Sequence, residues 1–360
     1  AIYKAAGKQE LYLKQRPEEF EKLVEIAKVQ STESSNAIEG IVTTNTRIKQ
    51  LVTEKTTPRT RDEQEIAGYR DALNIIHENF DAIPVSKNYI LQLHKIMYSH
   101  MNNPMAGKTK SVQNYISATY PDGHSEVLFT PLAPYETEEA LDKICEEYNK
   151  VIGNLELEPL IAIPTFIHDF LCIHPFNDGN GRMSRLLTTL LLYRSGFYVG
   201  KYISLEAKIA NNKELYYDSL NKSQDGWHEG YEDATPFIKY ILGTILAAYK
   251  DFESAIQSVK LHNHTLVLHV KSFAPESEQK PGNIKLRSIV DFLLAFPDYD
   301  KADVIRLHGL TGGLPAVAKE LNADIPFEEN LKILLKHDSA FSNFAPSILQ
   351  RLFRSPESYH

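Results

Sequence analysis

The stretch His174-Pro175-Phe176-Asn177-Asp178-Gly179-Asn180-Gly181-Arg182-Met183-Ser184-Arg185 decides how the rest of the chain is interpreted. Gly179, Asn180 and Gly181 can adopt a tight, partly left-handed backbone that turns successive N–H groups toward one anion. A leucine-rich run with helical spacing follows at 186–191. We therefore expect this loop to lie at a helix N-terminus, where the free amides and the helix dipole favour negative charge.

The side chains of the same stretch indicate phosphoryl chemistry. Arg182 and Arg185 are about one helical turn apart, so both guanidinium groups can reach one ligand. Asp178 offers a hard oxygen ligand suited to Mg²⁺, and His174 offers a base that titrates near neutrality. The alternative is a capped, glycine-rich turn with surface arginines and a core histidine. Such a turn needs neither the base nor the second arginine.

These residues resemble the Fic motif, H-x-F-x-D/E-G-N-G-R-x-x-R, at every fixed position. A second segment, Ser35-x-x-x-Glu39-Gly40, resembles the inhibitory motif S/T-x-x-x-E-G/N of Fic proteins. Gly40 is typical of a residue that ends a helix in the left-handed region, so Glu39 is an acid in the last turn, where the helix dipole disfavours it. The resemblance implies the class with an N-terminal inhibitory helix, in which Glu39 pairs with Arg185.

The resemblance, which covers roughly residues 31–250, also implies an activity: transfer of AMP from ATP to a hydroxyl side chain of a protein. His174 would be the catalytic base and Asp178 the Mg²⁺ ligand, with Ser35 and Glu39 inhibitory. Phe176 is expected to pack into the core. The residues expected to hold the nucleotide are Asn177, Gly179, Asn180, Gly181, Arg182, Arg185, Tyr216 and Tyr217. For the two tyrosines, simple packing within a helix over 204–220 is an equal alternative.

The predicted fold class is all-α, a mainly helical Fic core with one β-hairpin flap, plus a small C-terminal winged-helix-like module. We expect an N-terminal helical region at 1–83 that contains the inhibitory helix, and a catalytic core at 84–256. A linker at 257–282 and the C-terminal module at 283–360 follow. Apolar residues at helical spacing support the helices.

Residues 111–131 are the exception to the helical pattern. Two β-type runs flank the turn Pro121-Asp122-Gly123-His124, which predicts a hairpin; an irregular surface loop is the alternative. By resemblance this is the Fic flap, whose edge holds the target protein by strand addition. The Gly-Gly turn usual in the family is replaced here by a longer polar tip.

Composition limits the other possibilities. The chain has 360 residues and a formal net charge of −8, which argues against a general nucleic-acid coat or a binder of anionic membranes. Cys145 and Cys172 fall in apolar helical patterns and are expected to be buried free thiols in a reducing compartment. No apolar run is long enough to span a bilayer and no signal-peptide core is present. We expect a cytoplasmic protein.

Three alternatives remain open at this point. The same loop could transfer UMP or phosphocholine instead of AMP. It could remove AMP, with Glu39 positioning a water. The chain could also be a DNA-binding regulator acting through its C-terminal module, although residues 280–360 are not basic, so DNA binding is not expected. Self-modification and a homo-oligomer are both compatible with the sequence.

Overall fold

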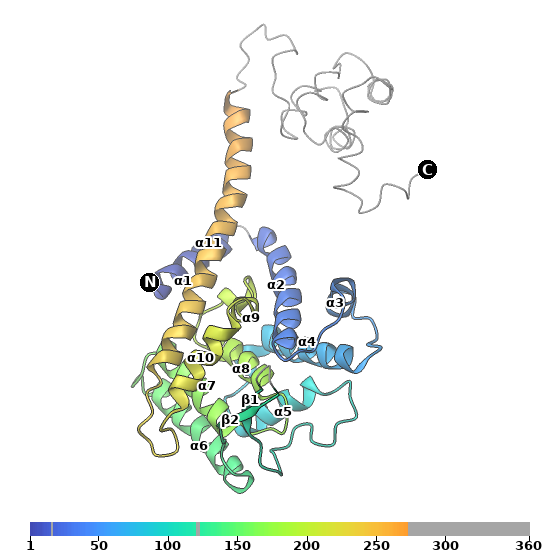
Figure 1. Ribbon diagram of the computed structural model, residues 1–360. Coiled ribbons are helices and arrows are strands. Elements are labelled where there is room, and N and C mark those ends of the chain that lie inside the picture. The colour runs from blue at the N-terminus through green and yellow to red at the C-terminus, as the bar shows by residue number, and fades with distance from the viewer. Residues whose placement is uncertain (16, 120–122, 273–360) are drawn as a thin grey trace. The chain divides into compact units, whose positions relative to one another are not determined.

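The computed structural model describes residues 1–15, 17–119 and 123–272 (Figure 1). The predicted winged-helix-like module at 283–360 and the linker residues 273–282 lie outside this range. The chain divides by its internal contacts into one unit at Ala1–Ala255 and another at Ile256–His360. All of the predicted site residues belong to the first unit, which is the one described below.

The N-terminal part of this unit is helical, as predicted. Its elements are α1 (Ile2–Gln15), α2 (Pro17–Ile38), α3 (Asn45–Val52), α4 (Arg61–Asn79), the short 3-10 helix η1 (Phe80–Ala82) and α5 (Lys87–Met97). Thr44 and Thr60 cap α3 and α4, because each hydroxyl accepts a backbone N–H three residues further on. Gly40 follows α2 with φ +79°, and this left-handed residue ends the helix as expected.

The predicted hairpin is present as two antiparallel strands, β1 (Ile116–Thr119) and β2 (Ser125–Phe129). Ser117 pairs with Val127, and a bulge separates this pair from Ile116 and its partner Phe129. The strands form the only sheet within the described ranges. The fold is therefore the expected one, a mainly helical domain that carries one small hairpin.

The helices after the hairpin form the core around the motif. They are α6 (Pro134–Gly153), α7 (Pro159–Ile173), α8 (Asn180–Arg194), η2 (Val199–Lys201), α9 (Leu205–Ala210), α10 (Lys213–Gln224) and α11 (Thr235–Ser272). Helix α8 packs against α7, α4 and α2 (Figure 1). Nearly every side chain of α8 is buried, including Leu186, Leu187 and Leu191. This burial fixes the helix whose N-terminus carries the motif.

Two boundaries differ from the expectation. The single helix predicted over 204–220 is two helices, α9 and α10, because Asn211 and Asn212 interrupt it and Asn212 leaves helical geometry. The described part of the predicted linker, 257–272, is helical and continues α11. Cys145 and Cys172 are free and buried, as predicted. Within the described ranges no helix has both the length and the apolar character needed to cross a bilayer.

Candidate active site

The motif loop connects α7 to α8. Helix α7 ends at Ile173, and His174 adopts a left-handed conformation with φ 51° and ψ 62°. Gly179, with φ 84°, precedes the first residue of α8. The Asn180 side chain closes the loop, since its oxygen accepts from the Phe176 N–H at 2.9 Å and its amide donates to the Phe176 carbonyl at 2.7 Å. The loop thus lies at a helix N-terminus, as predicted, with the first amides of α8 lacking acceptors within the helix.

His174 is held as a neutral imidazole. Its Nδ1 lies 3.2 Å from the Leu171 carbonyl oxygen. A carbonyl can only accept, so Nδ1 carries the proton and Nε2 keeps its lone pair. Burial lowers the pKa of His174 from 6.5 to about 4. At neutral pH the ring therefore presents an unprotonated nitrogen that can accept a proton.

A cavity of about 560 Å³ opens in front of this loop. Its walls are formed mainly by the motif, the hairpin, α10 and Glu39, which follows α2. Its lining includes His174, Asn177, Asp178, Gly179, Asn180, Gly181 and Arg185 of the motif, Ile116, Ser117, Ala118 and Leu128 of the hairpin, and Lys213, Tyr216, Tyr217, Leu220 and Asn221 of α10, with Glu39. The structure thus gathers most of the predicted site residues around one space.

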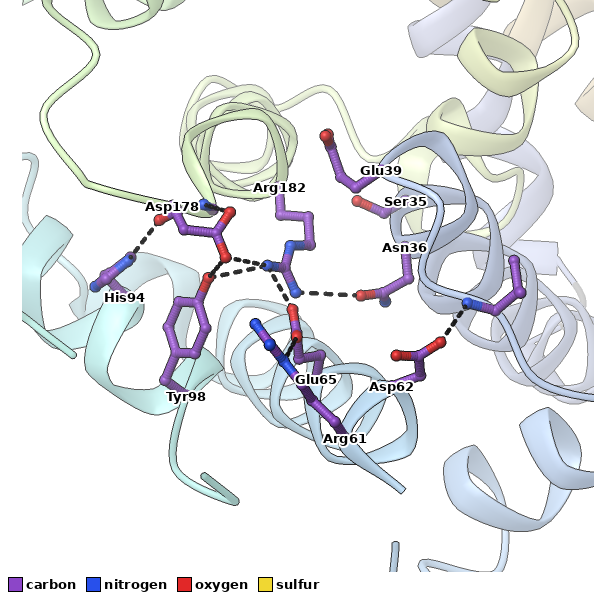
Figure 2. A network of polar contacts seen from close by, with 12 residues as sticks. Ser35, Asn36, Glu39, Arg61, Asp62, Glu65, His94, Tyr98, Asp178 and Arg182 are labelled. Atoms are coloured by element: carbon purple, nitrogen blue, oxygen red, sulfur yellow. Dashed lines mark hydrogen bonds and ion pairs between the residues drawn. The ribbon is translucent and has the colours of Figure 1, made fainter. Parts of the chain in front are cut away.

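Asp178 is fixed from two sides (Figure 2). Its Oδ2 accepts a hydrogen bond of 2.8 Å from the Tyr98 hydroxyl, and its Oδ1 accepts the Gly179 N–H at 2.7 Å. His94 accepts the Gly107 N–H on Nδ1, so its Nε2 donates to the Asp178 carbonyl at 3.1 Å. The Asp178 side chain is nevertheless 63% exposed. A carboxylate that is oriented yet open to the cavity can still bind a cation.

Arg182 lies elsewhere than expected for a nucleotide ligand. Its side chain is only 1% exposed and extends from α8 toward α4 and α5 (Figure 2). One terminal nitrogen lies 2.8 Å from Glu65 Oε2 and 2.9 Å from the Tyr98 hydroxyl, and the other is 3.5 Å from Asn36 Oδ1. It is not among the cavity's lining residues. Its role as a nucleotide ligand stays a prediction, and the observed contacts connect α8 to its neighbours.

Arg185 is tied to the end of α2. It donates from Nε to Ser35 Oγ, and from Nη2 to both the Ser35 carbonyl and Glu39 Oε1, each at 2.8 Å. The Arg185 side chain is 3% exposed and that of Glu39 is 32% exposed. The predicted pair between Glu39 and Arg185 is therefore present.

The Glu39 carboxylate also lies directly over the glycine loop. A Cβ built on Gly181 would come within 2.4 Å of Glu39 Oε1. Position 181 therefore has to be glycine while Glu39 lies there, and the carboxylate occupies space beside the first amides of α8. This is where the sequence predicts an anionic ligand.

Tyr216 and Tyr217 both line the cavity, and their rings meet edge to face at 5.2 Å. Tyr216 is 3% exposed, and its ring also contacts Phe237 and Tyr240. It therefore also packs in the hydrophobic core. Tyr217 is 36% exposed. The packing alternative is observed for Tyr216, while contact of either tyrosine with a nucleotide stays a prediction.

Phe176 is fully buried and stacks on His94 with ring centroids 3.7 Å apart. It packs into the core as expected. Three further residues hold Asp178 and Arg182 and could not be found from the sequence: Tyr98 just after α5, Glu65 on α4 and Asn36 on α2. Their spacing along the chain carries no signal, because they meet the motif only after folding. Glu65 is an acidic residue that is only 4% exposed, and its burial is visible only in the folded structure.

Comparison with known proteins shows what this chain is similar to. The Fic/DOC family model matches residues 84–192. The chain is 27% identical over 186 residues to protein adenylyltransferase fic-1 of Caenorhabditis elegans, covering 50% of this chain and 32% of that protein. It is 31% identical over 126 residues to a Fido domain-containing protein of Dictyostelium discoideum, covering 35% of this chain and 83% of that protein. The chain thus spans about a third of the length of the nematode relative.

Solved structures show the same fold. A Fic domain-containing signaling protein from Bacteroides thetaiotaomicron superposes with a TM-score of 0.57 at 23% identity, covering 69% of this chain and 95% of that one. A Fic family protein from Desulfovibrio desulfuricans also gives 0.57, at 20% identity, covering 89% of this chain and 88% of that one. With the motif, the hairpin and these similarities together, the chain belongs to the Fic/DOC family.

Proposed function

We propose that this chain transfers AMP from ATP to a hydroxyl side chain of a protein, and that Glu39 restrains the reaction. The observation that carries the proposal is the convergence of a neutral imidazole, an oriented carboxylate and a buried arginine on one cavity at the N-terminus of α8. The relatives in C. elegans and Nematostella vectensis are named protein adenylyltransferases, which supports the same chemistry here.

His174 is the proposed general base. Its unprotonated Nε2 takes the proton of the incoming Ser, Thr or Tyr hydroxyl, whose oxygen attacks the α-phosphorus of ATP. A new P–O bond forms to the protein, the bond between the α-phosphorus and the bridging oxygen breaks, and pyrophosphate leaves. The amides at the start of α8, around Gly181, are suited to the phosphate charge. Removing the base is expected to slow transfer by roughly 10²–10⁴-fold.

Asp178 is suited to bind Mg²⁺ together with the substrate phosphates. Among the described residues no three His, Cys, Asp or Glu side chains form a metal-binding cluster. Mg²⁺ needs no such cluster, because it is usually bound through one or two carboxylates and takes its remaining ligands from substrate phosphates and water. When bound, Mg²⁺ would neutralise phosphate charge. Tyr98 keeps the Asp178 carboxylate turned toward the cavity.

Glu39 is the proposed restraint. Its carboxylate pairs with Arg185 and lies against Gly181, so it competes with the phosphates for both the guanidinium group and the helix N-terminus. ATP can then settle with its α-phosphorus in line only after Glu39 moves away. Ser35 strengthens the arrangement, because it supplies two further acceptors for Arg185.

The hairpin is the proposed docking site for the target protein. Val127 and Leu128 are 54% and 42% exposed on β2, and β1 contributes Ile116, Ser117 and Ala118 to the cavity wall. An extended segment that pairs with the hairpin would bring its hydroxyl to His174. A loop of a second copy could dock in the same way, which allows self-modification. Buried free thiols suit a reducing compartment such as the cytoplasm.

Labelling of a cell lysate tests the proposal. Glu39→Gly protein is incubated with lysate and with ATP or UTP, each radiolabelled at the α-phosphate, and labelled bands are identified by mass spectrometry. Labelling from ATP that disappears in Glu39→Gly with His174→Ala is the expected result. Labelling from UTP alone would favour transfer of UMP. Release of label from a premodified target by the wild type, lost in Glu39→Gly, would favour removal of AMP.

A further inference from the structure

The segment that leads into the hairpin is hydrogen-bonded to the backbone of the catalytic loop. Lys110 and Asn114 together donate hydrogen bonds to four successive carbonyl groups of the loop, those of Ile173, His174, Pro175 and Phe176. The Phe176 carbonyl also accepts from Asn180. Lys110 donates from Nζ to the Ile173 carbonyl at 3.0 Å and from its backbone N–H to the Pro175 carbonyl at 2.8 Å. Asn114 donates to the His174 and Phe176 carbonyls at 3.4 and 3.0 Å.

The two residues also orient each other. Lys110 Nζ donates to Asn114 Oδ1 at 2.9 Å. An ammonium group can only donate, so this bond fixes which end of the Asn114 side chain is the oxygen and turns its NH₂ group toward the loop. Lys110 is 3% exposed. In the described part of the chain no carboxylate lies within ion-pair distance of its Nζ, so the partners of this buried charge are the Asn114 oxygen and the loop itself.

The end of α7 explains why a buried lysine is tolerated here. The last carbonyls of a helix have no partner within the helix and carry the negative end of its dipole. The Ile173 carbonyl is one of them, and Lys110 satisfies it while gaining a favourable field. Burial lowers the pKa of Lys110 to about 8, which leaves the group mostly protonated at neutral pH.

The hydrogen bonds from Lys110 and Asn114 support the backbone of His174. A residue with a Cβ is disfavoured in the left-handed region, and His174 is there with φ 51°. The carbonyls on both sides of His174, and its own, are all bonded to Lys110 or Asn114. If they were released, the loop could relax, and the bond from His174 Nδ1 to the Leu171 carbonyl would no longer be enforced.

We propose that Lys110 and Asn114 are positioning residues that hold the catalytic loop, and with it the His174 imidazole, in the orientation that transfer requires. The expected fall in the rate of transfer rests on the proposed function. The expected change in the orientation of the His174 ring does not. Asn114 lies two residues before β1, so the same pair joins the proposed target-docking hairpin to the base. The nucleotide-binding part of the loop, from Asn177 onward, is held by other groups.

The test uses the full chain with Glu39→Gly as the active parent and adds Lys110→Met, Lys110→Arg, Asn114→Ala or Lys108→Met. Lys108 is exposed and two residues from Lys110, so its replacement is the matched control for loss of a charge. We expect kcat to fall by roughly 10–100-fold in Lys110→Met and Asn114→Ala, as for a slightly misplaced reacting group. The KM for ATP should change by less than about threefold. Lys110→Arg should recover most of the loss.

The second measurement does not depend on transfer. The ¹⁵N NMR shifts of His174 distinguish the two imidazole tautomers, and we expect the Nδ1–H form in the parent and in Lys108→Met, but a mixture in Lys110→Met and Asn114→Ala. Unchanged tautomer populations in both variants would overturn the proposal, whatever the kinetics. A parent that transfers no AMP would refute the proposed function, and the NMR result would still decide the positioning role. Should Lys110→Met fail to fold, Asn114→Ala carries the comparison.

Discussion

Replacing Glu39 with glycine removes one of the three hydrogen bonds that tie Arg185 to α2, and it is the only one made to a charged acceptor. The pair is short, at 2.8 Å, and Arg185 is almost fully buried, while Glu39 keeps a third of its side chain in solvent. A hydrogen bond to a charged group of this kind contributes about 1.5–3 kcal/mol. At about 1.4 kcal/mol for each factor of ten, productive binding of ATP should rise roughly ten- to a hundredfold.

The assay is the initial rate of AMP incorporation into the chain itself or a target, measured over a range of ATP concentrations. Wild type, Glu39→Gly and Glu39→Gln are compared with Ala37→Gly as the matched control. Ala37 is exposed in the last turn of α2, so its replacement loosens the helix by about 1 kcal/mol without touching Arg185. Glu39→Gln, which keeps the shape and loses the charge, should give an intermediate rate.

Two results would show that the Glu39–Arg185 pair is not the restraint. Equal rates for wild type and Glu39→Gly would show that the carboxylate does not restrain the reaction. Equal activation by Ala37→Gly and Glu39→Gly would show that helix loosening, rather than the ion pair, matters. Adding Arg185→Ala to Glu39→Gly should abolish the gain, because the arginine that the glutamate releases is also the proposed phosphate ligand.

Three further outcomes are expected. His174→Ala in the Glu39→Gly background should abolish transfer but leave ATP binding by calorimetry nearly unchanged; near-normal transfer would exclude this base. Asp178→Asn should raise the Mg²⁺ concentration needed for half-maximal transfer by at least about tenfold, since the loop loses its hard anionic ligand; an unchanged titration would mean that Asp178 does not hold the metal. Burial lowers the pKa of His77 to about 3 and those of His94 and His174 to about 4, so the unfolded state binds more protons than the folded state below about pH 6.5. Urea unfolding at pH 5 should therefore show about 4–6 kcal/mol less stability than at pH 7. A smaller loss in His77→Phe would confirm its share, and equal stability at both pH values would contradict the burial argument.

The motif could be predicted from the sequence because its chemistry is local. The turn of Gly179, the start of α8 and the base at His174 all lie within twelve residues, and backbone preference with side-chain type is enough to place them. The end of α2 could be predicted for the same reason, because Gly40 by itself indicates a left-handed residue that terminates the helix. Both predictions rest on residues whose physical requirement does not depend on distant contacts.

The rest of the site depends on partners that are far apart in the chain. Arg182 meets Tyr98 across 84 residues, and a sequence gives no measure of whether an arginine at a helix start will face the ligand or the core. The division of 204–220 into α9 and α10 was missed for a different reason. Two asparagines disfavour a helix only weakly, so the sequence carries little signal for a break at Asn211 and Asn212.

Whether the chain transfers AMP, and whether His174 is the base, is decided by following the two ends of ATP separately. Glu39→Gly protein, with and without His174→Ala, is incubated with ATP radiolabelled at either the α- or the γ-phosphate, and the protein is examined by autoradiography and intact mass. We expect label from the α-phosphate only, a mass gain of one AMP, and the loss of both when His174 is replaced. Label from the γ-phosphate on the protein, or undiminished α-label without His174, would contradict this expectation.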